Sequence, residues 1–141
     1  MFANTAKTLL SLGAAVLLAT GCAGMMDKPG SIKLSGAQEV PPVTTSATGS
    51  GVITVAADGA VSGSVTTTGV AGTMAHIHVG AVGKNGPVIV PLAKTSDGVW
   101  SVPAGAKLTA EQLASFKAGD LYVNVHSDAN KGGEVRGQMK P

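Results

Sequence analysis

Turn residues recur at short intervals along most of this chain, and their spacing limits how it can fold more than any other feature. The 141 residues include 20 glycines and 7 prolines, and the segments between turns are rich in Val, Ile and Thr. Asp58-Gly59 separates two such segments, so residues 51–68 are predicted to form a β-hairpin. Further strands are expected at residues 73–80, 87–94, 99–103, 120–127 and 134–139.

One segment, residues 108–119, has a helical pattern instead. Thr109 is placed to cap a helix, and Gln112 follows at the spacing of a capping box. Gly119 lies where such a helix would end. Seven or eight strands and one short helix predict an all-β fold, either a β-sandwich or a small barrel.

Composition excludes several classes of function. The formal net charge is only +2, and aromatic residues make up 3% of the chain. Such a chain has neither the electrostatic field nor the stacking surfaces that nucleic-acid binding requires, so no nucleic-acid partner is expected. The sequence also lacks a G-x-S-x-G elbow and an evident pair of carboxylates for acid–base catalysis. We therefore expect a protein that is not an enzyme.

The first 21 residues have the pattern of a lipoprotein signal peptide. Lys7 precedes an apolar run of about a dozen residues, shorter than the roughly 20 residues that span a bilayer. The run ends at the single cysteine, Cys22, which follows small residues and resembles a bacterial lipobox. We expect residues 1–21 to be removed, Cys22 to be acylated and held in the lipid bilayer, and residues 22–31 to form a lipidated tether. Ala23 follows the cysteine where aspartate would favour the inner membrane, so the expected location is the outer membrane of the cell envelope.

The three histidines lie in two of the predicted strands. Because side chains alternate along a strand, His76 and His78 share one face of the first strand, opposite aliphatic neighbours. His126 lies on the corresponding face of residues 121–127. If the two strands pair, or flank a common neighbour, the three imidazoles can converge on a copper or zinc ion. Met74 and Met139 are candidate soft ligands for Cu(I).

The alternative interpretation is that these histidines are ordinary polar residues, solvated or hydrogen-bonded to neighbours such as Asn124 and Glu134. The spacing of Glu134 and Arg136 predicts a surface ion pair on one strand face. Tight reversals predict a positive φ at Gly86 and at Gly133.

Three blocks of the chain resemble the CHRD domain, which is named after repeats in chordin. They are SGAQEVPPVTTSATG, AHIHVGAVGKNGPVIVPL and LYVNVHSDANKGGEVRGQ, within the expected domain at residues 32–141. Ser127 replaces the more usual threonine. The resemblance implies an exported protein, and bacterial members are often lipoproteins without an assigned activity. The histidine layout is also loosely similar to the copper strands of copper–zinc superoxide dismutase, but the fourth copper histidine, the zinc ligands and the paired cysteines are missing.

These observations lead to two hypotheses. The first is a membrane-anchored, extracytoplasmic binding or structural module on an immunoglobulin-like or dismutase-like antiparallel β-sandwich, whose partner is an unidentified protein or small ligand. The second is an envelope protein that binds copper or zinc, for redox chemistry or metal handling, through His76, His78 and His126. No catalytic residue is assigned in either.

Overall fold

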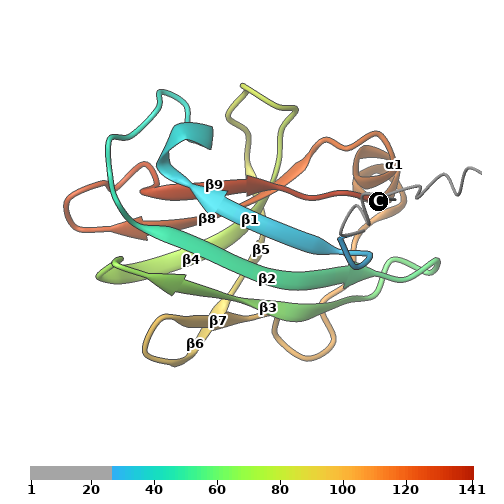
Figure 1. The fold of residues 1–141 in the computed structure, drawn as a ribbon. Helices are drawn as coiled ribbons and strands as arrows, with labels where there is room; N and C mark the ends of the chain where they lie inside the picture. Colours follow the sequence, from blue (N-terminus) through green and yellow to red (C-terminus); the bar gives the residue numbers. More distant parts are fainter. Residues whose placement is uncertain (1–26) are drawn as a thin grey trace, which may run out of the picture.

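The computed structural model describes residues 27–141, so the predicted signal peptide and Cys22 lie outside the described residues. Within this range the regular secondary structure is mostly β, with nine strands, one 3₁₀ helix and one α-helix (Figure 1). The elements are β1 (Ser31–Ser35), η1 (Gly36–Gln38), β2 (Thr48–Val55), β3 (Val61–Thr68), β4 (Gly72–Val79), β5 (Val88–Pro91), β6 (Ala93–Ser96), β7 (Val99–Ser101), α1 (Ala110–Lys117), β8 (Leu121–Ser127) and β9 (Val135–Gln138). No helix among these elements is long and apolar enough to cross a bilayer.

All nine strands belong to one antiparallel sheet that curls back on itself. Its order is β5-β4-β8-β9-β1-β2-β3-β7-β6, so β5 and β6 form the two outer edges. These edge strands are consecutive in the chain and are joined only through Leu92, whose N–H donates to the carbonyl of Ala75 on β4 (2.9 Å). The all-β prediction and the β-sandwich are therefore confirmed, with a sheet that is nearly closed.

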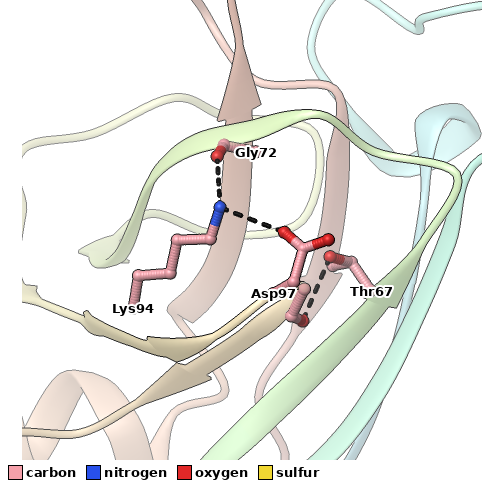
Figure 2. Close-up of polar contacts among 5 residues, drawn as sticks. Thr67, Gly72, Lys94 and Asp97 are labelled. Carbon is pink, nitrogen blue, oxygen red and sulfur yellow. Dashed lines mark hydrogen bonds and ion pairs between the residues drawn. The ribbon is translucent and has the colours of Figure 1, made fainter.

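A second set of contacts holds the closing edge in place (Figure 2). The Lys94 ammonium on β6 donates to the carbonyl of Gly72 on β4 at 3.4 Å and pairs with Asp97 at 3.3 Å. Thr67 on β3 donates to the carbonyl of Gly98 at 3.3 Å. Lys94 and Asp97 are exposed, so we assign their ion pair a small share of stability and attribute the closure to packing.

The core lies between the two halves of the curled sheet. Alternate residues of β4 and β8 point inward, so that Ile77, Val123 and Val125 are completely buried. They pack with the other buried hydrophobic residues, which include Ile32, Leu34, Ile53, Val61, Val65, Trp100, Leu108, Phe116, Leu121, Val135 and Met139. The outward residues of β4 and β8 are consequently left to form a second, polar cluster.

Several local predictions are confirmed. Residues 51–68 form the β2–β3 hairpin, with Gly59 in the turn at φ 89°. Thr109 and Gln112 form the capping box at the start of α1. The single strand expected over residues 87–94 is wrong, because the chain leaves one edge of the sheet at Pro91 and joins the other at Ala93.

Candidate metal centre

β4 and β8 are neighbouring antiparallel strands, and their register brings the three histidines together. Met74 lies opposite His126, His76 opposite Asn124, and His78 opposite Tyr122. One ring nitrogen from each histidine lies within 4.8 Å of the chosen nitrogens of the other two. The convergence predicted from strand alternation therefore occurs.

Backbone carbonyls fix the protonation pattern of two of these rings. Nδ1 of His78 lies 2.9 Å from the carbonyl oxygen of Gly86, and Nδ1 of His126 lies 2.8 Å from that of Lys131. Because a carbonyl oxygen only accepts, each Nδ1 carries the hydrogen and each neutral ring keeps a lone pair on Nε2. Nδ1 of His76 lies 3.0 Å from Nε2 of His126, so His76 is the donor in that contact. This arrangement matches protein metal sites, in which a ligating histidine donates its other N–H to a carbonyl or carboxylate.

The histidines are far less solvated than the polar face of an ordinary strand. His78 and His126 are each only 7% exposed, whereas His76 is half-buried. Burial lowers the pKa of His76, and the neighbouring His126 and His78 lower it further. Burial also lowers the pKa of His78, against an opposing hydrogen bond to Gly86. His76 and His78 are therefore held neutral, the form in which imidazole binds a metal.

Two side chains, Tyr122 and Arg136, are stacked beneath His78. The ring of Tyr122 is stacked on His78, with centroids 4.7 Å apart and planes 6° from parallel. The guanidinium carbon of Arg136 lies 3.5 Å from the centroid of the Tyr122 ring, in a cation–π contact. Arg136 is only 1% exposed. Its guanidinium donates to the carbonyl of Ala81 (3.1 Å), Asn85 Oδ1 (3.3 Å) and Gln138 Oε1 (3.3 Å).

The predicted surface ion pair between Glu134 and Arg136 is wrong. Both residues are buried, and neither makes an ion pair within the described range 27–141. Arg136 instead lies over Tyr122, and Glu134 accepts a hydrogen bond from the hydroxyl of Thr45 at 2.9 Å. Connecting loops cover this face of the sheet, which is why side chains expected at the surface are enclosed.

Gly86 holds two rings of the site through its backbone. Its carbonyl accepts from His78, and its N–H donates to the Tyr122 hydroxyl at 3.2 Å. The positive φ predicted for Gly86 is wrong, because its backbone does not adopt the left-handed conformation. The positive φ predicted for Gly133 is confirmed, at 129°. Gly86 is needed for space instead, since a Cβ there would overlap the carbonyl oxygen of Val79.

Sequence reasoning missed Glu39, which lies near Asn124 and Arg136 at 4% exposure. Burial raises its pKa to about 7, against the lowering effects of the Arg136 charge and of Asn124. Three buried acceptors have no hydrogen-bond partner among the described residues: Glu39 Oε1, Asn124 Oδ1 and His78 Nε2. Glu39 belongs to the first of the three sequence blocks, but nothing in that block's pattern indicated burial.

The two methionine candidates differ in position. Met139 is 1% exposed and belongs to the hydrophobic core, so its prediction as a ligand is wrong. Met74 is 51% exposed and faces His126 across the β4–β8 pair.

The donor set suits a late transition metal. Nitrogen ligands lie about 2.0–2.1 Å from Zn²⁺ in a tetrahedral arrangement, so two nitrogens on one ion are about 3.4 Å apart. Closing the cluster from its outer limit of 4.8 Å therefore brings two ring nitrogens closer by about 1.4 Å at most. His76 is the least buried of the three and the one whose Nδ1 is not fixed by a carbonyl, so its ring is the one free to adjust.

The fold and the site together define an antiparallel β-sandwich that carries a buried three-histidine cluster on the outer face of two adjacent strands. The chain belongs to the CHRD domain family, whose family model matches residues 31–139. This confirms the resemblance found in the sequence blocks. No curated protein and no solved structure matched the chain.

Proposed function

We propose that this CHRD-domain protein binds one copper or zinc ion through His76, His78 and His126. The observation that carries the proposal is the buried, unpartnered Nε2 of His78, whose lone pair is fixed by the Nδ1 contact to Gly86. A buried acceptor without a donor costs about 1–3 kcal/mol, and an ion shared with the other two rings would offset this cost. The pKa values of His76 and His78 are lowered, which favours the neutral imidazole form that binds a cation.

The proposed setting is the cell envelope, with the domain held to the outer membrane by acylated Cys22. The supporting observation is the cysteine itself, which follows an apolar run and small residues. Metal handling on a lipid-anchored domain would keep the ion close to the membrane surface.

Metal titration tests the proposal. Protein treated with a chelator is titrated with Cu²⁺ and with Zn²⁺ against a competing chelator, and we expect one ion per chain. His78→Ala and His126→Ala should abolish tight binding. Lys107→Ala is the matched control, since it removes only an exposed ion pair with Asp58. Elemental analysis of protein purified from its own envelope identifies the ion.

Two results would contradict the proposal. The absence of tight stoichiometric binding to the wild-type protein would remove it. A loss of about 1–3 kcal/mol of stability in each histidine variant, with no metal bound to any of them or to the wild type, would show that the cluster is a structural hydrogen-bonded group.

A second candidate function is a binding module for a small ligand or a protein. It is favoured by a cavity of about 410 Å³ between η1 and the β4–β5 loop (residues 80–87). Arg136 and Glu39 contribute polar groups to its lining, and Val40, Pro42 and Val82 contribute apolar ones. Fragment screening by NMR tests this candidate: ligands that shift the Val82 and Gly83 resonances support it, and a screen without such shifts contradicts it.

A further inference from the structure

We propose that Met74 is a fourth ligand of the three-histidine site and makes it selective for Cu(I). This inference rests on the proposed metal function and names its ion. The starting observation is that Met74 is a large apolar side chain left 51% exposed, on a strand whose other face packs against the core.

The register places Met74 beside the ligands. Met74, His76 and His78 occupy alternate positions of β4 and therefore project from the same face. Met74 is also the direct cross-strand partner of His126, and the Cβ atoms of such partners lie about 4.5–5.5 Å apart. Three rotatable bonds allow a methionine thioether to reach a neighbouring group across this distance.

Solvent exposure of the four side chains increases from one side of the site to the other. His78 and His126 are buried at 7% exposure, His76 is half-buried, and Met74 is the most exposed. An ion arriving from solvent would therefore meet Met74 and His76 before the inner pair. A methionine at the open side can bind an arriving ion and release a departing one.

The chemistry of the thioether selects the ion. Imidazole binds copper and zinc alike, whereas the soft thioether sulfur favours Cu(I) and adds little for Zn²⁺. Three histidines alone do not distinguish these ions, but three histidines with one methionine do. The proposed role is therefore the binding and transfer of Cu(I), with no change in its oxidation state.

Comparison of Met74→Leu with the wild type tests the proposal, because leucine keeps the apolar volume and removes the sulfur. The full-length chain is used, purified in detergent, and every protein carries Cys22→Ser so that no thiol competes for Cu(I). Affinity for Cu(I) is measured anaerobically by competition with bicinchoninate, and affinity for Zn²⁺ by competition with a chromophoric chelator. Val52→Leu, at an exposed apolar residue of β2 that belongs to neither candidate site, is the control.

We expect Met74→Leu to weaken Cu(I) binding by about tenfold or more, since loss of even an outer-shell partner costs about 10–100-fold in metal affinity. Zinc affinity should stay unchanged, and X-ray absorption should show a sulfur neighbour of copper only in proteins that retain Met74. Equal Cu(I) affinity in the two proteins, with tight binding retained, would overturn the role of Met74 and leave the three-histidine site intact. Failure of the wild type to bind either ion would overturn the proposed function and this inference together.

Discussion

Gly86 and Gly83 lie in the same loop, and each of these positions requires glycine for a different reason. Gly83 has a φ of 76°, with open space where a Cβ would project, whereas a Cβ at Gly86 would meet the carbonyl of Val79. Gly83→Ala should therefore cost about 1 kcal/mol, from left-handed strain alone. Gly86→Ala should cost about 3 kcal/mol or more, from overpacking and displaced hydrogen bonds to His78 and Tyr122.

Denaturant unfolding of the two variants checks this prediction. The side-chain resonances of His78 provide a second measurement, because only Gly86→Ala should move them. Equal loss of stability in both variants, with unchanged His78 resonances, would contradict the role of Gly86 as the support of that ring.

Glu39 should make the protein less stable as the pH rises. Its carboxyl group ionises near 4.5 in the unfolded chain and at about 7 in the folded protein. Between these values the folded state binds more protons than the unfolded state, so the free energy of unfolding falls with rising pH, by about 3 kcal/mol in total. Glu39→Gln removes this titration, and the variant should gain stability relative to the wild type between pH 5 and pH 8.

Comparing the two proteins at each pH isolates Glu39 from the histidines. The lowered pKa values of His76 and His78 act in the opposite sense, because they reduce stability as the pH falls below about 6.5. Glu111→Gln is the control, since Glu111 is exposed on α1. A constant difference between Glu39→Gln and the wild type across this pH range would show that Glu39 is ionised throughout.

Single residues also mark the limit of sequence reasoning. Strand alternation was enough to place His76, His78 and His126 on one face, because a two-residue period is local. Strand alternation could not predict the burial of Arg136 and Glu39, because their burial depends on loops that meet only in the folded chain. The contact that joins two of these loops is Asn85 Nδ2 to the carbonyl of Val40 at 2.7 Å, between residues 45 positions apart.

At the scale of elements, α1 depends on its N-terminal cap. The Thr109 hydroxyl accepts from the N–H of Gln112 at 3.2 Å, and the Gln112 side chain accepts from the N–H of Thr109 at 2.9 Å. With eight residues, the helix is too short to be stable by propensity. Thr109→Ala should therefore lower stability by about 1 kcal/mol, measured by thermal or denaturant unfolding.

Ser115→Ala serves as the matched change within the same helix. The Ser115 hydroxyl donates to the Glu111 carbonyl four residues earlier, a contact that gives a helix no benefit. This variant should be as stable as the wild type or slightly more stable. A larger loss for Ser115→Ala than for Thr109→Ala would mean that the capping box does not support α1.

The strands illustrate what an element's own sequence can and cannot specify. The β2–β3 hairpin was predictable because its turn and both its strands are contiguous. The division of residues 87–94 into β5 and β6 was not, because both halves are extended and only their partners differ. Leu92 turns into the core between them, and this change of partner is decided by the closure of the whole sheet.

At the scale of the whole molecule, the curled sheet places two kinds of side chain, which alternate along the same strands, on its two opposite faces. Inward residues of β4 and β8 form the aliphatic core, and outward residues form the histidine cluster and its Tyr122–Arg136 support. The β4–β5 loop (residues 80–87), visible above the sheet in Figure 1, and the β8–β9 loop (residues 128–134) each provide a carbonyl that orients one histidine. The site is therefore a product of the complete fold, because strands alone would leave His78 and His126 free to rotate.

The proposed attachment of this molecule to a membrane depends on one atom, the sulfur of Cys22, which lies outside the described residues. Each buried methylene of an acyl chain contributes about 0.8 kcal/mol, so several chains on one cysteine would make release rare. Wild-type protein should stay with the membrane fraction and begin at an acylated Cys22. Cys22→Ala should lack acyl chains and be found either uncleaved in the inner membrane or released by another peptidase. Mass spectrometry of the N-terminal peptide and membrane fractionation distinguish these results; an acylated variant, or a wild-type chain that begins elsewhere, would contradict the anchor.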